Sequence, residues 1–546
     1  MLILLVPLVL IVAVLALGIH LPNKRFARLL TLPTHRYAPL VAGLVTGAAV
    51  WYVWGSLRAV APVHDEASYL LQARTFASFH WAMPAPPLPE FFEQYHALVT
   101  PVYASKYPPG HGLLLVPGIW LSLPGLTPVL LSVLAGALLF MLVRRVANGW
   151  VAVLTFVLWL STIGNLRWRG SYLSETTTSA LWLLGWWALL EWRERRANRW
   201  LVVLAGCVAW MAITRPFTAV AYAIPVGIVV IADVVKRRSW RELVRPILVA
   251  LAIVAILPLA NKETLGNWRT APYETYTATY LPWDHLGFGV TDTPAQRPLP
   301  PDMQQFSAQF ISVHAGHTLN RLPSIYLIRW RAILADAFHG WRIPLALFAL
   351  IGFSVLGIEG WLAVASALLL TGVYLLYASI PNWTVYYLEI FPVIPFLVAL
   401  GIWTVAAALV TPRLHVGPRL VREEGPRQAF AIALVVLMVL WPGGYEVHFG
   451  RRVEAAVQAY HGSFRQRLAA LPDRREIIFV RYAPWHSVHQ SLIANEPNLA
   501  TAKRWFVYDR GEDNQRLAAL APDREPFLFD ENSGTFVQLK RTLARR

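Results

Sequence analysis

Two adjacent carboxylates stand in His64-Asp65-Glu66, just after a long apolar run. Charged groups close to hydrocarbon are costly and tend to be kept for function, and a carboxylate can take a proton from an attacking nucleophile. The alternative interpretation is structural, with Asp65 capping a helix over Glu66–Phe79 by accepting backbone N–H bonds. The two roles are compatible, because a cap would also fix the direction of the carboxylate.

A second stretch surrounds Lys106 and runs from Tyr103 to Gly112, with the sequence YASKYPPGHG. Its prolines prevent helix and set a rigid entry into the next apolar segment. They would hold Lys106, Tyr103, Tyr107 and His111 at the membrane surface, where a cation and phenol donors suit a lipid phosphate. The alternative is a snorkelling lysine among aromatic anchors.

Two further stretches place charges next to apolar runs. Arg167–Glu175 has the sequence RWRGSYLSE, and Glu175 would lie one turn inside the next helix, where an isolated charge is expensive. A structural ion pair between Glu175 and Arg169 is the alternative. Arg215 precedes Pro216 in a break between two apolar runs, and a helix break with a snorkelling arginine explains it equally well.

Tyr273 and Tyr276 lie in a long aromatic loop that suits contact with a sugar or a lipid, although an interfacial amphipathic segment is the favoured interpretation. His314 and His317 are three residues apart, which alone is a weak metal signal. The sequence has no HExxH, no Walker lysine loop and no GxSxG. We therefore assign no metal ligands. Cys207, the single cysteine, excludes an intrachain disulfide.

The elements that must position these residues are apolar helices. The chain has 546 residues, of which 56% are hydrophobic and 14% charged, whereas a soluble chain is about 25% charged. Many apolar runs reach the ~20 residues needed to cross a bilayer as a helix. About twelve crossings are predicted, and the first is expected to be a retained helix rather than a signal peptide. The predicted spans are Leu2–Leu21, Pro39–Leu57, Leu126–Val143, Trp150–Leu166, Tyr172–Leu190, Trp200–Ile213, Pro216–Val235, Leu243–Ala260, Ile343–Leu356, Trp361–Ala378, Leu388–Val410 and Ala429–Trp441.

The net charge of +17 comes mainly from short loops on one side of these spans. This positive-inside pattern makes that side cytoplasmic and argues against nucleic-acid binding. Its basic residues are Lys24, Arg25, Arg28, Arg36, Arg144, Arg145, Arg193, Arg195, Arg196, Arg199, Lys236, Arg237, Arg238, Arg241, Arg245, Arg413, Arg419, Arg422 and Arg427. The charge pattern therefore predicts a multi-pass protein located in the cytoplasmic membrane.

The other side receives the irregular segments, namely a first external loop over 58–125, a long external loop over 261–342 and a tail over 451–546. In the first loop, Ala67–Phe79 predicts an interfacial amphipathic helix and Gly112–Leu123 a dipping or juxtamembrane helix. The tail predicts a small α/β extracytoplasmic domain, following a transmembrane domain over 1–450. Its strand-like segments are Glu476–Arg481, Trp505–Tyr508, Phe527–Asp530 and Thr535–Leu539, and its helix-like segments are Ser487–Ala494 and Asn514–Leu520.

All the chemically competent stretches fall on this external side. Carboxylates, a lysine, arginines and tyrosines together suit the transfer of a sugar from a lipid phosphate to a hydroxyl or amine. A carboxylate would accept the acceptor's proton, and the cations would stabilise the departing phosphate. No nucleotide motif is needed, since such a donor is already activated.

The order of these motifs resembles the C-type membrane glycosyltransferases, in the branch of protein O-mannosyltransferases and lipid A aminoarabinose transferases. The resemblance covers about Val41 to Pro225. It implies Asp65 as the catalytic base with Glu66 as its partner, and Glu175 as the second acidic position. It also implies that Tyr103 and Lys106 contact the donor phosphate and that Arg215 is the basic residue before proline; we add Tyr107 and Arg169 to this phosphate-binding set. His111 follows the prolines here, where the family often has a histidine before them, so we retain His111 and His64 as possible substrate contacts.

The sequence therefore predicts a polytopic α-helical glycosyltransferase that uses a polyprenyl-phosphate sugar. Its acceptor would be a lipid, glycan or protein, and it would need no cofactor, although a divalent cation bound by Asp65 and Glu175 stays possible. The rival from another class is a transporter or flippase of lipid-linked sugars, which would need paired halves with broken helices near the midplane. A scaffold that presents the tail would leave Asp65, Lys106 and Glu175 without a role.

Overall fold

The computed structural model describes residues 2–21, 24–291, 293–410 and 425–541, and most of them are helical. Each of the twelve predicted spans falls on helix. Long apolar runs form helices because a helix satisfies its own backbone polar groups where no water is available. The corresponding helices are α1 (Leu2–His20), α3 (Ala38–Trp54), α6 (Leu126–Val146), α7 (Gly149–Leu160), α9 (Glu175–Arg195), α10 (Asn198–Ala212), α11 (Pro216–Arg237), α12 (Val244–Val254), α13 (Ile256–Leu265), α17 (Ala346–Phe353), α18 (Ile358–Val373), α19 (Val393–Val410) and α20 (Pro426–Leu468).

The number of crossings is smaller when judged by helix length and apolarity alone. Within the described residues, six helices are long and apolar enough to span a membrane, or up to nine if each bent helix pair is one span. Leu5–His20 and Asn198–Ala212 are shorter apolar helices. The chain is thus a multi-pass membrane protein by these criteria, and twelve crossings remain a prediction.

One bent pair shapes the candidate site. α7 and α8 (Ile163–Arg169) meet at an angle of 73°, and the turn after α8 leads directly into Glu175 at the start of α9. Arg342 supports the bend: its guanidinium donates to Leu158 O at 2.9 Å and to Ser161 Oγ at 2.6 Å. It also binds Glu446 of α20 at 2.6 Å. Arg342 is 2% exposed, so this ion pair lies inside the protein.

Replacing Arg342 by methionine should destabilise the protein strongly. The change leaves the Glu446 carboxylate buried without its main counter-charge, and breaking one side of a buried ion pair costs about 3–5 kcal/mol. The drop in the thermal unfolding midpoint in detergent measures this loss. Arg331→Met is the matched control, because Arg331 is exposed on the nearby helix α16 (Leu322–Ala337). Equal midpoints for the two variants would contradict the structural role of Arg342.

The basic helix ends lie together at one end of the bundle. Arg145, at the end of α6, binds Glu191 of α9 at 2.8 Å. Arg193 and Arg196, at the end of α9, bind Asp233 of α11 at 3.1 and 3.3 Å. The third, fifth and seventh predicted spans therefore end on the same side, as the charge pattern requires. Arg413, Arg419 and Arg422 lie outside the described residues.

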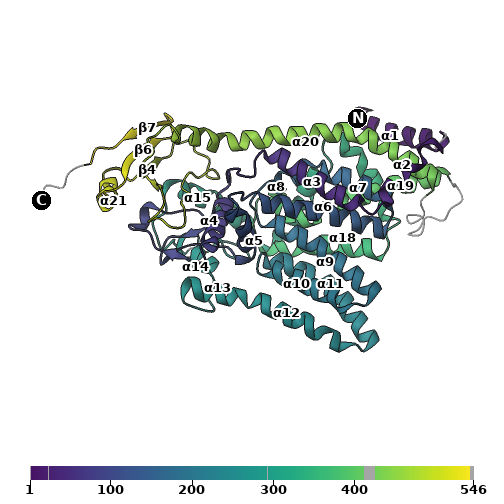
Figure 1. The fold of residues 1–546 in the computed structure, drawn as a ribbon, viewed down its shortest axis with the longest axis horizontal. Helices are drawn as coiled ribbons and strands as arrows, with labels where there is room; N and C mark the ends of the chain where they lie inside the picture. The colour runs from purple at the N-terminus through teal and green to yellow at the C-terminus, as the bar shows by residue number, and fades with distance from the viewer. Residues whose placement is uncertain (1, 22–23, 292, 411–424, 542–546) are drawn as a thin grey trace.

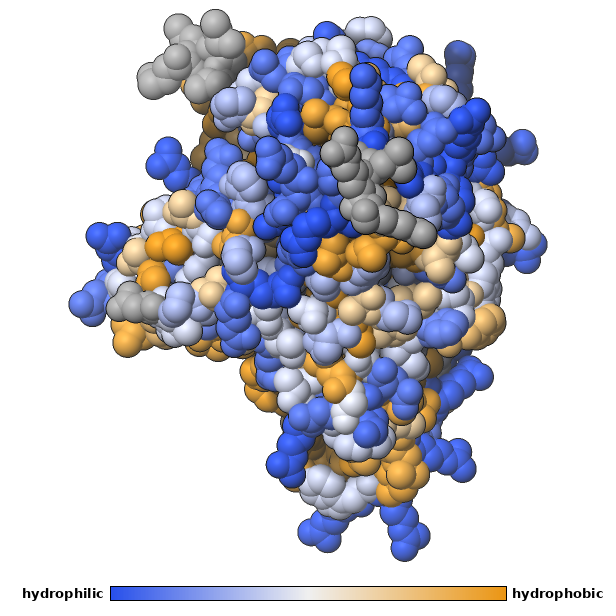
Figure 2. Space-filling model, turned by 90° about the vertical axis from the view of Figure 1, so that its left-hand side faces the viewer, coloured by the Kyte–Doolittle hydropathy of each residue, from blue (hydrophilic) through white to orange (hydrophobic). Residues whose placement is uncertain are grey.

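The irregular segments gather at the opposite end of the bundle (Figure 1). The amphipathic helix of the first loop is α4 (His64–Ala77), and the predicted dipping helix is α5 (Pro109–Trp120). Between them lies a small antiparallel sheet of order β1-β3-β2, formed by Met83–Pro84, Val102–Ser105 and Ala97–Leu98. α14 (Pro272–Tyr280) and α15 (Pro301–Gly316) come from the long loop. Hydrophilic residues cover much of the upper part of this end (Figure 2).

The tail forms a four-stranded sheet of order β5-β4-β6-β7, in which β4 is parallel to β5 and β6 while β7 is antiparallel. The strands are β4 (Glu476–Arg481), β5 (Arg504–Tyr508), β6 (Glu525–Asp530) and β7 (Thr535–Gln538), and the helix is α21 (Asn514–Leu520). All four strand-like segments are thus strands. Ser487–Ala494 is not a helix: the N–H groups of Leu492 and Ile493 donate to the Tyr482 and Ser491 side chains.

The tail packs against the first external loop. Leu71 of α4 and Tyr103 of β3 share one apolar cluster with Phe479 of β4 and Val507 of β5. Burial of such side chains from water is favourable, by about 1.5–3 kcal/mol for a large aliphatic or aromatic group. The sheet is therefore held directly beside the elements that carry Asp65 and Lys106. Its status as a separate domain remains a prediction.

Candidate functional site

Asp65 lies in the first turn of α4 and does not cap it. The residue before the helix is the extended Val63, and it makes no side-chain cap. A carboxylate in the first turn is favoured by the helix dipole. Glu66, the next residue, is 2% exposed and accepts the Tyr172 N–H at 2.8 Å. The capping interpretation of Asp65 is therefore wrong, and the two neighbouring carboxylates point to different partners.

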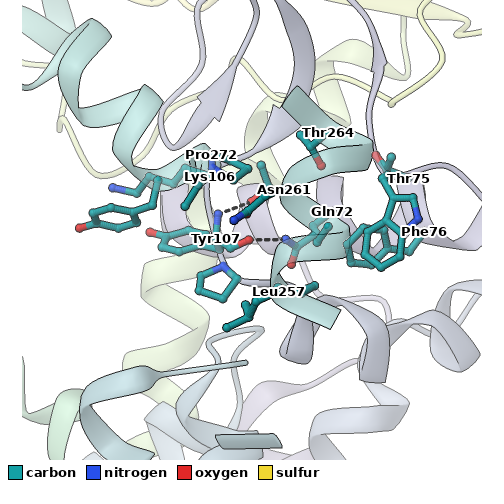
Figure 3. Close-up of a pocket in the computed structure, with 16 residues that line it drawn as sticks. Gln72, Thr75, Phe76, Lys106, Tyr107, Leu257, Asn261, Thr264 and Pro272 are labelled. Atoms are coloured by element: carbon teal, nitrogen blue, oxygen red, sulfur yellow. Dashed lines mark hydrogen bonds between the residues drawn. The ribbon is translucent and has the colours of Figure 1, made fainter. Parts of the chain in front are cut away.

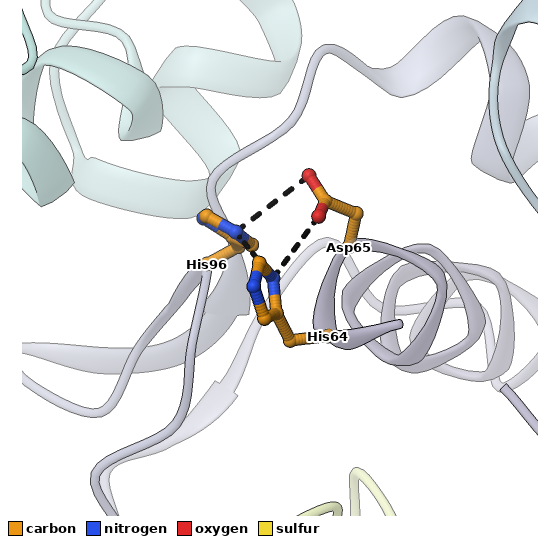
Figure 4. A group of neighbouring side chains, drawn as sticks. All are labelled: His64, Asp65 and His96. Carbon is orange, nitrogen blue, oxygen red and sulfur yellow. Dashed lines mark hydrogen bonds and ion pairs between the residues drawn. The ribbon is translucent and has the colours of Figure 1, made fainter. Parts of the chain in front are cut away.

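The Asp65 carboxylate faces three polar side chains. The Tyr107 hydroxyl donates to Oδ1, His64 Nδ1 lies 3.0 Å from Oδ2, and His96 Nε2 lies 3.6 Å from Oδ1. Figure 4 shows the side chains of His64, Asp65 and His96 turned toward one another. Burial opposes ionisation of Asp65, but His96, His64 and the Tyr107 hydrogen bond outweigh it and hold the pKa of the carboxyl well below its usual range.

Lys106 is 3% exposed and lies in a cage of tyrosines. Its Nζ is 4.5 Å from the ring centroid of Tyr273, 4.9 Å from that of Tyr276 and 5.5 Å from that of Tyr107. Aromatic faces attract a cation at such distances. The nearest carboxylate is Asp284, at 3.8 Å. Burial lowers the pKa of the Lys106 amine, and the neighbouring carboxylates of Asp284 and Asp65 oppose this lowering.

A short hairpin places His96 beside Lys106. In the β2–β3 pair, Ala97 faces Ser105, and the next residues outward are His96 and Lys106. The Lys106 N–H donates to His96 O at 2.9 Å. Ser68 of α4 donates to the same carbonyl at 2.6 Å. These bonds fasten the hairpin to α4, so the residues around Asp65 and Lys106 form one rigid group.

Glu175 pairs with Arg215, not with Arg169. Arg215 Nη1 lies 2.6 Å from Glu175 Oε1, and Arg215 also donates to the Tyr374 hydroxyl at 2.6 Å. The Glu175–Arg169 ion pair considered as an alternative is thus absent. The acidic start of α9 is linked to the Asp65 group through tyrosines: Tyr107 stacks on Tyr69 at 4.3 Å, and the Tyr69 hydroxyl donates to Ser174 at 2.9 Å.

Three of the predicted site residues have other surroundings. Tyr103 is buried in the apolar cluster under the tail and donates to Gln94 at 2.7 Å. Arg169 is fully buried in the bundle, with its Nε donating to Asn165 at 2.9 Å and its guanidinium over Trp159. His111 donates from Nε2 to Tyr172 O and accepts at Nδ1 from Thr177, which supports the turn before α9. The structure does not bring these residues to the Asp65 group.

A cavity of about 60 Å³ lies beside Lys106 and Tyr107. α13 and α14 form one wall, and α4 with the Lys106 segment forms the other (Figure 3). Gln72 donates to Tyr107 O at 2.6 Å across its floor. Leu257, Phe76, Asn261 and Thr264 complete its lining with both apolar and polar groups. A cavity that combines apolar side chains with a lysine suits an amphiphile with an anionic head group.

Three residues at the site escaped the sequence-based assignment. His96 contacts Asp65, Tyr374 binds Arg215, and His489 of the tail lies 3.3 Å from His64. Asp284, which contacts Lys106, belongs to the same aromatic and polar loop as Tyr273 and Tyr276, which the sequence had linked to substrate contact. The three missed residues are isolated in the sequence, and their proximity depends on segments far apart in the chain.

Comparison with known proteins identifies the fold. No protein-family model matches the chain, and no curated protein matches it. Among solved structures, the chain is similar to ArnT from Cupriavidus metallidurans bound to undecaprenyl phosphate, with a TM-score of 0.51, 14% identity and 91% of both chains covered. The apo state of the same ArnT matches with a TM-score of 0.45 and 15% identity over 90% of this chain and 89% of that one.

A third similarity is to the archaeal oligosaccharyltransferase AglB from Archaeoglobus fulgidus in complex with an inhibitory peptide and a dolichol-phosphate. Its TM-score is 0.39 and its identity 10%, over 94% of this chain and 75% of that one. Of these three, the undecaprenyl-phosphate-bound ArnT supports the fold, and this likeness of fold agrees with the resemblance that the sequence motifs indicate.

Proposed function

We propose that this protein is a glycosyltransferase that moves a sugar from a polyprenyl-phosphate donor to a lipid, glycan or protein acceptor at the outer face of a cytoplasmic membrane. One observation carries the proposal: Tyr107 joins a partly buried carboxylate to a caged lysine, donating its hydroxyl to Asp65 while its ring faces Lys106. A base and a phosphate-binding cation are the two groups that such a transfer needs within one site.

The ArnT structure that shares the fold was solved with undecaprenyl phosphate, which supports a lipid-phosphate donor here. The lining of the cavity combines apolar side chains, such as Leu257 and Phe76, with the amine of Lys106, which suits a lipid phosphate.

In this mechanism Lys106 receives the phosphate and exchanges its contact with Asp284 for the donor oxygens. Asp65 accepts the proton of the acceptor as the acceptor's oxygen or nitrogen bonds to the anomeric carbon. The bond from that carbon to the phosphate oxygen breaks, and the departing phosphate keeps the electron pair. Attack from the face opposite the phosphate inverts the anomeric centre. Arg215, held by Glu175, provides a second cation on the far side of the Tyr69–Tyr107 pair.

The outer-face assignment follows from the charge pattern of the loops. The basic ends of α6 and α9 pair with Glu191 and Asp233. These helix ends lie at the opposite end of the bundle from α4, which carries Asp65 (Figure 1). Since basic loops stay in the cytoplasm, the site and the tail would lie outside it.

The test is transfer or donor hydrolysis by the purified protein in detergent, with a panel of polyprenyl-phosphate sugars. We expect release of polyprenyl phosphate from one donor by the wild type and not by Asp65→Asn. Transport of a lipid-linked sugar across liposomes without any cleavage of the sugar–phosphate bond would instead establish the rival class.

A further inference from the structure

Two histidines converge with Asp65 on a common point. His64, Asp65 and His96 each offer one ligand atom, all within 4.8 Å of one another, and no other such group of three occurs among the residues that the structure describes. His64 Nδ1 lies 2.8 Å from His96 Nε2 and 3.0 Å from Asp65 Oδ2, and His96 Nε2 lies 3.6 Å from Asp65 Oδ1 (Figure 4). Ligand atoms around a tetrahedral ion with bonds of about 2.0–2.1 Å are about 3.3 Å apart, which lies within the range of these three spacings.

Protons alone satisfy this arrangement poorly. A neutral imidazole carries one N–H and one lone pair. If His64 Nδ1 carries its proton, that proton must serve both Asp65 and His96. If His64 Nδ1 is unprotonated, its lone pair faces the Asp65 carboxylate at 3.0 Å. A cation at the common point would be bound by all three lone pairs at once.

The backbone of His96 is strained in a way that aims its side chain. Its φ of 58° is in the left-handed region, which is unfavourable for a residue other than glycine. Three hydrogen bonds hold it there: its carbonyl accepts from Ser68 and Lys106, and its N–H donates to the Tyr276 hydroxyl at 2.9 Å. The imidazole is 5% exposed, and its Nδ1 has no hydrogen-bond partner among the described residues.

The other two ligands are oriented by surrounding groups, as in metal sites generally. The ring of His64 stacks on Tyr95 at 4.6 Å, and its second nitrogen, Nε2, lies 3.3 Å from His489 Nδ1. The Tyr107 hydroxyl binds the second oxygen of Asp65. Each ligand therefore keeps one atom for an ion while another part of its side chain is held.

We propose that His64, Asp65 and His96 bind a divalent first-row transition-metal ion of the Zn²⁺ class. Two imidazoles and one carboxylate form the ligand set of catalytic zinc sites that keep an open position. This set differs from the Asp65–Glu175 pair considered from the sequence, because Glu175 is bound to Arg215. Binding itself needs only these three side chains, whereas the role of the ion rests on the proposed function.

That role follows from the position of the site beside Lys106. Lys106 neighbours His96 directly in the hairpin, so an ion there and the lysine would face the same donor phosphate. A phosphate oxygen would complete the coordination of the ion. Together the two cations would stabilise the charge that develops on the phosphate as it leaves.

The experiment measures Zn²⁺ binding by competition with a chromophoric chelator, on metal-stripped full-length protein without a polyhistidine tag. We expect one tight site per chain, and visible absorption bands of a four- or five-coordinate ion when Co²⁺ is used. His64→Ala and His96→Asn should each weaken Zn²⁺ binding more than 100-fold, since loss of an outer-shell partner alone costs about 10–100-fold. Asparagine is chosen at position 96 because it tolerates the left-handed backbone.

His80→Ala is the matched control, because His80 is exposed in the same loop and lies outside the cluster. An absence of stoichiometric binding and of Co²⁺ bands in the wild type would overturn the proposal even if a variant failed to fold. So would equal losses in the cluster and control variants. Transfer activity without metal binding would refute the metal site alone, and tight binding without any donor turnover would refute the proposed function alone.

Discussion

The variant Asp65→Asn should lose sugar transfer while keeping its fold and its affinity for the donor. Asparagine has nearly the same shape and can still accept the Tyr107 hydrogen bond, but it cannot take up a proton at neutral pH. A positioned general base contributes about 100- to 10,000-fold to rate, so we expect a fall in kcat of that size. The measurement is transfer rate at saturating donor, with donor binding determined separately.

Glu66→Gln is the sharpest control for this experiment, because it changes the adjacent carboxylate in the same way. Glu66 is buried against the Tyr172 N–H, and a glutamine oxygen can accept that bond equally well. Burial also raises the pKa of Glu66 well above its usual range, which favours the neutral form. The rate of Glu66→Gln should therefore stay close to the wild type. Equal losses in the two variants would refute the assignment of Asp65 as the base.

The Zn²⁺ measurement separates two origins of the Asp65→Asn defect. If Asp65→Asn still binds Zn²⁺ with near wild-type affinity and is inactive, the lost proton acceptor explains the defect and Asp65 is not a ligand of the ion. If Zn²⁺ binding falls in parallel with the rate, the carboxylate acts through the ion and the defect is no evidence for a base.

Lys106→Ala should weaken donor binding more than it lowers the rate of sugar transfer from bound donor. A hydrogen bond to a charged group contributes about 1.5–3 kcal/mol, and each 1.4 kcal/mol is tenfold in affinity. The dissociation constant for a polyprenyl-phosphate sugar should thus rise about 10- to 100-fold. Titration of the purified variant with donor or with polyprenyl phosphate gives this number directly.

Lys262→Ala controls for the loss of a positive charge near the same entrance. Lys262 is on α13, one wall of the cavity, but its side chain is exposed and donates to Gly266 O. It should leave donor affinity unchanged. The role assigned to Lys106 is wrong if both lysine variants bind the donor as tightly as the wild type.

Much of the architecture was predictable because it rests on local patterns. Apolar runs near 20 residues predicted helices at all twelve places, since a helix is the local solution to an environment without water. Short segments rich in β-branched and aromatic residues predicted the four strands of the tail. Two local predictions failed. Ser487–Ala494 is not a helix, because hydroxyl groups from Tyr482 and Ser491 accept its backbone N–H groups, and Asp65 lies in the first turn of α4 instead of capping it.

The structure also brings together several of the residues that the sequence singled out. Asp65, Tyr107, Lys106, Tyr273 and Tyr276 meet in one group. Their residue types predicted this, because carboxylates, cations and phenols at a membrane surface need one another. Glu175 and Arg215 are likewise joined, although the sequence suggested Arg169 as the partner.

The tertiary structure alone decided which residues complete the site. His96 is 31 positions after Asp65, Asp284 is 178 positions after Lys106, and His489 is 425 positions after His64. Hydrophobic periodicity and helix capping relate residues within a few helical turns, so they cannot predict contacts between residues this far apart in the chain. These contacts exist because a strained hairpin, a folded loop and the tail all pack onto α4, and that packing placed the imidazole of His96 beside the predicted base.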